Sequence, residues 1–238
     1  MTERLDKWLS SRSAHSRRDV HEWIKNSKVR VNGVIQKDAA AHVCETDEIT
    51  VNGEHFSGEK HVYIMMHKPK GVVSVSDAPG DTTVIDLLPD SLKRNGLFPA
   101  GRLDRDTTGF VLITDDGEFA HRILSPRHHV TKTYSVTLRD PAQESYAETF
   151  RNGIQLADGT QCLSAEIEFT SDPYCVIVHL HEGRYHQVKR MFASLGNTVV
   201  ELHRDSIGGL SLDPALSAGE SRLMTAEEVL TVDKSLNK

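Results

Sequence analysis

Apolar residues near the amino terminus recur at the spacing of helices. The segments 5–9 and 20–24 each place apolar side chains at positions i, i+3 and i+4, which predicts two short helices with one buried face each. Ser16 stands before the second segment at the N-cap position, and Asp19 follows three residues later, as in a capping box. We therefore expect the second helix to begin directly after Ser16.

The pattern then changes to that of short strands. Asn32-Gly33 lies between β-branched residues in the segment 29–35, which is a strong signal for a two-residue hairpin. Residues 49–51 predict a further strand, closed by Asn52-Gly53. The segment 55–60 has no apolar period and contains a Ser-Gly pair, so we expect a linker there. This divides the chain into a small domain, 1–56, and a larger one, 57–238.

In the larger domain, strand patterns and helix patterns alternate. The expected strands are 63–67, 71–75, 109–114, 130–138, 165–169, 175–181 and 198–203. The expected helices are 117–124, 142–151, 185–195 and a last one capped by Thr225. Many strands with few helices predict an α+β fold with a mixed, mostly antiparallel sheet flanked by helices.

Charge is distributed unevenly between the two parts. Residues 1–37 contain nine Lys or Arg and four acids, which gives +5, while the 238-residue chain as a whole carries −6. The remainder therefore carries −11. This asymmetry predicts a basic amino-terminal module joined to an acidic body. Five cations of the module, here named the basic set, are candidates for phosphate contacts: Arg17, Arg18, Lys25, Lys28 and Arg30.

Composition excludes several other classes of protein. The chain has no run of about 18 apolar residues, so we expect no membrane span. Its first residues are charged where a signal peptide is apolar, and its three cysteines form no CxxC pair. These features predict a cytoplasmic protein with reduced thiols. No large apolar interface is indicated, so a monomer is the expectation.

The first candidate site is the segment GRLDRDTTG, residues 101–109, which precedes an apolar strand. Asp104 and Asp106 would lie on a loop held by a rigid sheet, a common place for functional side chains. A solvated turn is the alternative, because acidic residues are common in turns. The pair also leaves open a hydrolase that uses two carboxylates.

Two further segments carry polar residues in suggestive places. Lys132-Thr133-Tyr134 lies in an expected strand, and the Tyr134 ring could stack on a base or pack in the core. EGRYHQVKRMF, residues 182–192, brings cations to a helix start, which favours an anionic ligand or a solvated basic face. Lys189 or Arg190 could also keep a catalytic carboxylate ionised.

Signals for cofactors and metals are weak. The chain contains neither GxGxxG nor a P-loop, so nucleotide cofactors have no support. His179 and His181 alternate on one strand, but no further ligands accompany them at a useful spacing, so no metal site is expected.

Together these segments resemble the motifs of the pseudouridine synthases. GRLDRDTTGFVLITDDG resembles the catalytic motif, KTY the second and EGRYHQVKRM the third, and HKPKGVVS, 67–74, resembles the opening of the catalytic domain. The first 55 or so residues resemble the αL RNA-binding module of a small-subunit ribosomal protein. Module and motifs occur in the order typical of the RsuA-type branch, and the resemblance covers nearly the whole chain.

The resemblance implies a role for each matched residue. Asp104 would be the essential carboxylate, which either attacks C1′ or removes the C2′ proton. Tyr134 would stack on the target uracil, and Lys189 would stabilise the ionised Asp104 where many relatives carry Arg. Arg102 would replace the flipped-out base or contact phosphate, and Arg184 and Arg190 would contact RNA. The isomerisation needs no cofactor and no catalytic metal.

The resemblance also implies a substrate. It is the uridine at position 516 of 16S rRNA, recognised in a small-subunit assembly intermediate. A target in 23S rRNA and a non-catalytic assembly factor that only binds RNA are the alternatives.

Overall fold

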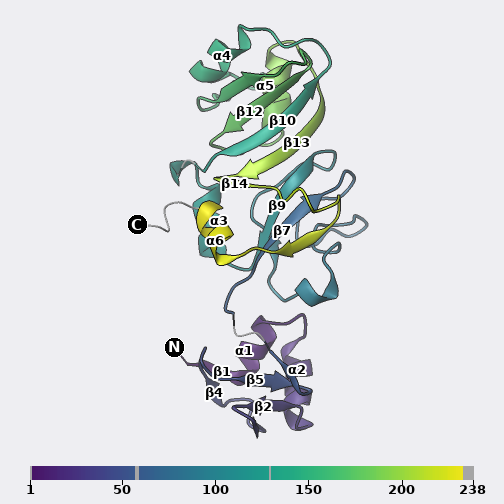
Figure 1. Cartoon of the computed structure of the whole chain (residues 1–238), viewed down its shortest axis with the longest axis vertical. Coiled ribbons are helices and arrows are strands. Elements are labelled where there is room, and N and C mark those ends of the chain that lie inside the picture. Colours follow the sequence, from purple (N-terminus) through teal and green to yellow (C-terminus); the bar gives the residue numbers. More distant parts are fainter. Residues whose placement is uncertain (1, 57–58, 129, 233–238) are drawn as a thin grey trace. The chain divides into compact units, whose positions relative to one another are not determined.

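The computed structural model describes residues 2–56, 59–128 and 130–232, which form two compact units (Figure 1). The first comprises Met1–Val62 and Pro89–Leu97, and the second comprises Tyr63–Leu88 and Phe98–Lys238. This division differs from the expected boundary after residue 56. The expected linker at 55–60 includes residues 57–58, which lie outside the described residues.

The first unit combines two helices with two small sheets. Its helices are α1 (Leu5–Ser11) and α2 (Arg17–Lys25). A four-stranded antiparallel sheet has the order β3-β2-β5-β6, with β2 (Val29–Val31), β3 (Val34–Ile35), β5 (Ile49–Val51) and β6 (Glu54–His55). A second antiparallel pair joins β1 (Glu3–Arg4) to β4 (His42–Val43). The apolar faces of both helices are buried in one cluster with the sheet.

The local signals of this unit are confirmed. Ser16 and Asp19 form the full capping box, since each side chain accepts a hydrogen bond from the other residue's backbone N–H. Asn32 and Gly33 both have positive φ, 50° and 78°, as a type I′ turn between β2 and β3 requires.

The short segment Pro89–Leu97 returns to the first unit from far along the chain, which no pattern in the sequence predicted. Asn95 fixes it, because its backbone N–H donates to Ser13 O at 2.8 Å. Its side-chain amide donates to the carbonyls of Ser10 and His15 at 3.1 and 2.8 Å. The chain therefore passes between the two units three times.

A nine-stranded sheet forms the centre of the second unit, as the mostly antiparallel α+β expectation requires. Its main path is β11-β12-β10-β13-β9-β7-β15, with β8 and β14 paired to β9 and β13. The strands are β7 (Tyr63–Lys68), β8 (Phe98–Pro99), β9 (Thr108–Thr114), β10 (Lys132–Leu138), β11 (Glu166–Phe169), β12 (Cys175–Leu180), β13 (Val199–Ile207), β14 (Leu210–Ser211) and β15 (Ser221–Leu223). Among the described strands of this sheet, only β9 and β13 pair in parallel.

Four α-helices pack on this sheet: α3 (Gly117–Leu124), α4 (Tyr146–Asn152), α5 (Gln187–Ser194) and α6 (Ala226–Val232). Short 3₁₀ turns occupy Asp90–Leu92 in the first unit and Pro126–His128 here. Helices α4 and α5 meet through ring contacts of Phe192 with Tyr146 and Phe150. At the other half of the sheet, α3 buries Phe119 and Ile123 against β7 and β9.

The expected strand at 71–75 is wrong. Only Val73 forms a bridge, with Thr83, and the segment leaves the sheet after Lys68. Its polar atoms serve another purpose, because the Ser74 hydroxyl hydrogen-bonds to the main chain of Leu103. The segment therefore supports the loop 101–107 instead of extending the sheet.

Candidate active site

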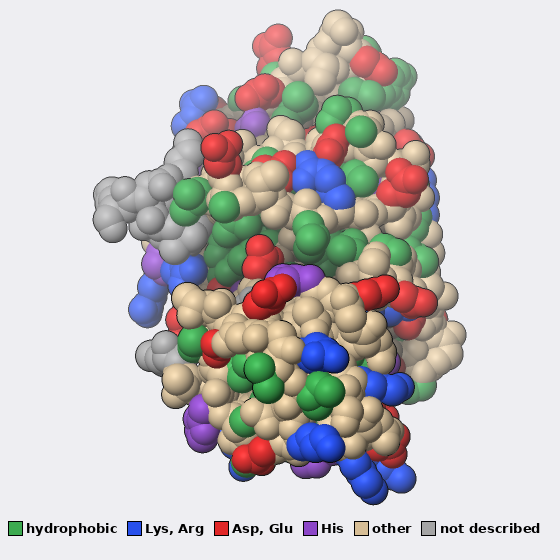
Figure 2. Space-filling view, turned by 60° about the horizontal axis from the view of Figure 1, so that its bottom comes forward, with side chains coloured by type: hydrophobic (Ala, Val, Ile, Leu, Met, Phe, Trp, Pro, Cys, Tyr) green, Lys and Arg blue, Asp and Glu red, His purple; other side chains and the backbone are tan. Residues whose placement is uncertain are grey.

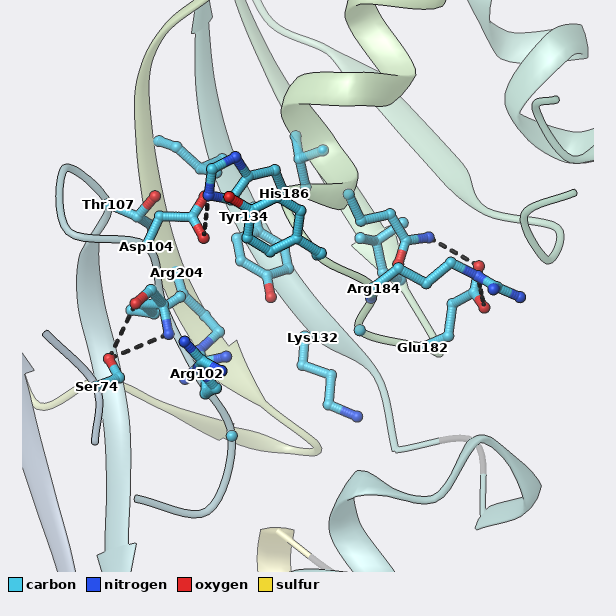
Figure 3. A pocket seen from close by; sticks show the side chains of 18 of the residues that line it. Ser74, Arg102, Asp104, Thr107, Lys132, Tyr134, Glu182, Arg184, His186 and Arg204 are labelled. Carbon is cyan, nitrogen blue, oxygen red and sulfur yellow. Dashed lines mark hydrogen bonds and ion pairs between the residues drawn. The ribbon is translucent and has the colours of Figure 1, made fainter. Parts of the chain in front are cut away.

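A cavity of about 600 Å³ opens in the second unit (Figure 3). The loop 101–107, strands β10 and β13 and the segment 182–188 supply most of its lining. All three motif segments of the sequence thus meet at one place. The volume is typical of small-molecule sites.

Asp104 lies on a loop that hydrogen bonds to the segment 71–74 hold in place. The Ser74 hydroxyl accepts from Leu103 N–H at 3.2 Å and donates to Leu103 O at 3.1 Å. Gly71 N–H donates to the carbonyl of Arg105 at 2.7 Å, and Thr107 N–H to that of Asp104 at 3.1 Å. These bonds fix the loop on both sides of Asp104, so a side chain placed there is preorganised.

The Asp104 carboxylate is about one-quarter exposed and has two basic neighbours from the third motif. Lys189 Nζ lies 3.3 Å from one of its oxygens, and His186 Nε2 lies 3.4 Å from the other. His186 adopts a left-handed conformation, φ 48°, directly before α5. The helix accordingly begins at Gln187, two residues later than expected, and this turn brings the imidazole to Asp104.

Lys189 is shared between two carboxylates. It donates to Asp106 at 2.5 Å, closer than its contact with Asp104. This hydrogen bond holds the pKa of the Asp106 carboxyl below its usual range. The arrangement supports Lys189 as the cation beside Asp104 and adds Asp106 as a second anchor for its ammonium.

The position of Tyr134 leaves both interpretations from the sequence open. Its side chain lies mostly in the core, yet the residue also lines the cavity. On β10 it is the direct cross-strand partner of Arg204 on β13. An aromatic ring and a guanidinium thus stand side by side on the face of the sheet that forms the cavity floor.

The remaining predicted contacts with RNA fall into two groups. Arg102 and Arg184 are exposed and line the cavity, and Arg184 is fixed by an ion pair with buried Glu182 at 2.9 Å. Arg190 is not among the cavity-lining residues and pairs with Asp158 at 2.5 Å. The geometry therefore gives more support to Arg102 and Arg184 than to Arg190.

Several charged residues at the site carried no role in the sequence analysis. Lys68, Lys132 and Arg204 are buried, although they are cations, and Lys132 and Arg204 line the cavity. Burial lowers the pKa of both Lys68 and Lys132 to about 8. Lys132 was visible in the KTY motif, but only the fold shows that its amine and the distant Arg204 approach the same cavity.

The basic set lies in the first unit, and all five side chains are exposed. Figure 2 looks onto this unit and shows Lys and Arg at several places on its surface. Exposed cations of this kind suit contacts with a phosphate backbone.

Two general findings concern the described residues only. No group of three or more His, Cys, Asp or Glu side chains is arranged to hold a metal ion. His179 is hydrogen-bonded to Glu168 and Thr133. Within the same residues, every helix is too short or too polar to cross a lipid bilayer.

Comparison with known families agrees with the fold and the cavity. The RNA pseudouridylate synthase model matches residues 62–194, and the S4 domain model matches residues 3–49. The chain belongs to the RNA pseudouridylate synthases, and its first unit contains an S4 domain. It is therefore a pseudouridine synthase of the RsuA type. This excludes the two alternatives left open by the sequence, a two-carboxylate hydrolase and a non-catalytic RNA-binding protein.

Individual relatives resemble the chain over nearly its full length. It is 44% identical to the ribosomal small subunit pseudouridine synthase A of Vibrio cholerae, covering 97% of this chain and 100% of that one. The protein of that name from Escherichia coli K12 is 42% identical, with coverage of 96% and 99%. A crystal structure of a pseudouridylate synthase aligns with TM-score 0.68 at 42% identity, covering 96% of this chain and 99% of that one.

Proposed function

We propose that this enzyme converts one uridine of 16S rRNA, at position 516, into pseudouridine, with Asp104 as the reacting carboxylate. Two relatives similar over nearly the whole chain are named small-subunit enzymes, which supports a small-subunit target over 23S rRNA. The substrate would be an assembly intermediate in the cytoplasm, bound by a monomer of the enzyme.

One observation carries the proposal for the mechanism. Asp104 is held by its braced loop at the edge of a cavity that also contains Tyr134, with Lys189 3.3 Å from its carboxylate. A base inside a helix cannot reach such a cavity, so the target uridine must be flipped out. Tyr134 would then pack against the uracil while Asp104 faces the ribose.

The reaction is an isomerisation, so the substrate and product contain the same atoms. Asp104 either attacks C1′ or takes the C2′ proton, and in both routes the C1′–N1 bond breaks. The uracil turns and C5 forms a bond with C1′; this step breaks the Asp104–C1′ ester bond in the first route, and Asp104 returns the proton to C2′ in the second. C5 then loses its proton and N1 gains one. Lys189 Nζ and His186 Nε2, at 3.3 and 3.4 Å from the Asp104 oxygens, would hold this carboxylate in place for either route.

RNA recognition would be divided between the two units. The basic set would contact phosphates in the folded rRNA, which adds affinity with little sequence information. Arg102 and Arg184 would contact the strand at the cavity, and Arg102 could fill the space left by the flipped base. Choice of one uridine would then depend on the shape of the assembled RNA.

The test is pseudouridine mapping of 16S rRNA from cells that lack this protein, complemented with wild type, Asp104→Asn or Asp90→Asn. The Asp90 side chain is 99% exposed and lies outside the cavity, so it is a matched Asp-to-Asn control. We expect one site to be lost in the deletion strain and restored by wild type and by Asp90→Asn. Asp104→Asn should bind RNA with unchanged affinity and restore nothing.

Each alternative gives a different result. Restoration by Asp104→Asn would remove this residue from the chemistry. An unchanged 16S map together with a lost site in 23S rRNA would move the target to the large subunit.

A further inference from the structure

Three buried cations lie around the base of the cavity without a carboxylate partner among the described residues. Lys68 is 0% exposed, Arg204 3% and Lys132 5%. Lys68 donates to three main-chain carbonyls at 2.7–3.3 Å, and Lys132 to Ile123 O at 3.0 Å. The Arg204 Nε–H donates to Phe110 O at 2.7 Å. Buried cations are usually paired with carboxylates, so this site holds positive charge in excess.

The guanidinium of Arg204 is the least satisfied of the three groups. Its Nη2 is buried and has no hydrogen-bond partner within the described residues. A buried donor left without an acceptor destabilises the folded state, so its presence here requires an explanation. Arg204 lines the cavity beside Tyr134, and Figure 3 shows Arg204 and Lys132 around the same hollow as Asp104.

The reaction generates an anion where these cations lie. When the C1′–N1 bond breaks, its electron pair remains on the uracil, whose negative charge spreads over N1 and the two carbonyl oxygens. This holds whether Asp104 forms an ester with C1′ or takes the C2′ proton. A preorganised donor aimed at developing charge in a closed site stabilises the transition state more than the ground state.

We propose that Arg204 is a catalytic residue that donates hydrogen bonds to a carbonyl oxygen of the uracil anion released on cleavage of the glycosidic bond. Lys132, which also lines the cavity, and the buried Lys68 add positive charge to this part of the unit. The inference rests on the proposed function in one respect: Asp104 must start the cleavage of the C1′–N1 bond. It holds for any uridine that the enzyme accepts.

The test uses the leaving ability of the base. Fluorine at C5 withdraws electrons and stabilises a uracil anion, so a substrate with 5-fluorouridine at the target depends less on a cationic donor. Full-length 16S rRNA with uridine or 5-fluorouridine at that one position is prepared by ligation and assembled with small-subunit ribosomal proteins. Loss of the N-linked nucleoside is followed under single-turnover conditions by mass spectrometry of nuclease digests.

Arg204→Met should lower the single-turnover rate with uridine by about 100–1000-fold, the usual effect of removing one such donor. The dissociation constant for RNA should stay within about threefold of wild type, because the effect is confined to the transition state. With 5-fluorouridine we expect a loss at least about tenfold smaller. Arg222→Met, which removes an arginine held by Asp213 and Glu228 outside the cavity, is the control and should leave both rates unchanged.

Two results would overturn the inference. An equal loss with both bases would give Arg204 a structural role, and weaker RNA binding at an unchanged single-turnover rate would make it a phosphate contact. Thermal unfolding checks each variant. If Arg204→Met is unfolded at the assay temperature, Arg204→Lys and Arg204→Gln are compared instead. With uridine, Arg204→Lys should react faster than Arg204→Gln, and with 5-fluorouridine the two variants should react at similar rates.

Failure of the proposed substrate would be visible separately. Wild type must first convert position 516 in the assembled RNA. If it does not, the proposed target is wrong, and the same comparison of bases is made at the uridine that the wild-type enzyme modifies.

Discussion

Gly109→Ala should destabilise the second unit strongly, because the close approach of β9 to β13 leaves no room for a side chain. An ideal Cβ on Gly109 would lie 2.6 Å from the backbone N of Arg204 and closer still to the Arg204 carbonyl oxygen. Both obstacles are main-chain atoms of a paired strand, so neither can rotate away. Gly109 also has φ +106°, a conformation that alanine adopts only under strain.

The magnitude follows from these two effects. A positive φ costs an L-residue about 1–2 kcal/mol, and overpacking against neighbours that cannot repack costs about 1–3 kcal/mol. The free energy of unfolding should therefore fall by about 2–5 kcal/mol. In a protein of this size each kcal/mol lowers the melting temperature by about 2–4 °C, so we expect a drop of about 4–20 °C.

Differential scanning calorimetry measures this change, with Gly117→Ala as the matched control. Gly117 is the first residue of α3, and a Cβ there would meet no atom within 4 Å. The free energy of unfolding of that variant should equal that of wild type or exceed it by up to about 1 kcal/mol, because alanine restricts the unfolded chain. Its melting temperature should therefore be unchanged or slightly higher. Gly109→Ala should also lose activity below its melting temperature, since separating the strands displaces Arg204. A wild-type melting temperature for Gly109→Ala would refute the close approach of the two strands.

Three further predictions concern pH, stacking and salt. Burial lowers the pKa of Lys132 from 10.5 to about 8, so between these pH values the unfolded chain binds more protons than the folded one, and the folded state gains stability as pH rises. In Lys132→Met this gain should be missing from melting temperatures measured between pH 7.5 and 10. A difference from wild type that stays constant with pH would contradict the assignment. Tyr185 is 73% exposed and its ring stacks on His186 at the cavity, so Tyr185→Ala should weaken RNA binding by about 1–3 kcal/mol in a filter-binding assay, as expected for the loss of one base stack. Tyr185→Phe should bind as wild type, and equal weakening in both variants would point to the hydroxyl. Replacing the basic set with Gln should reduce the slope of log K against log salt by roughly 0.7–0.9 for each phosphate contact removed, and an unchanged slope would exclude those contacts.

Local signals in the sequence predicted local structure well. The Ser16–Asp19 capping box and the Asn32-Gly33 turn formed as expected because each depends on residues within one turn of chain. The segment 71–75 has the β-branched residues of a strand but was predicted wrongly. Gly71 and Ser74 hydrogen-bond to residues about 30 positions away, and no local pattern encodes those partners.

The candidate site divides in the same way. Asp104, Tyr134 and Lys189 stood in recognisable motifs, and the structure places all three at one cavity or in contact with it. Arg204 belongs to no motif considered in the sequence analysis, and its position depends on the register of β13 against two other strands. His186 was inside a motif, but its role follows from a left-handed turn that the helical pattern did not reveal.

The parallel pairing of β9 with β13 also determines when the site can form during synthesis. It joins Thr108 and Gly109 to His203 and Arg204, which emerge from the ribosome some 95 residues later. Domains fold as their last required segments become available, and contacts between distant segments form slowly. A nascent chain that ends before β13 therefore has Asp104 but neither the cavity floor nor the strand that holds it. The active site therefore cannot form until the segment through Arg204 has left the ribosome.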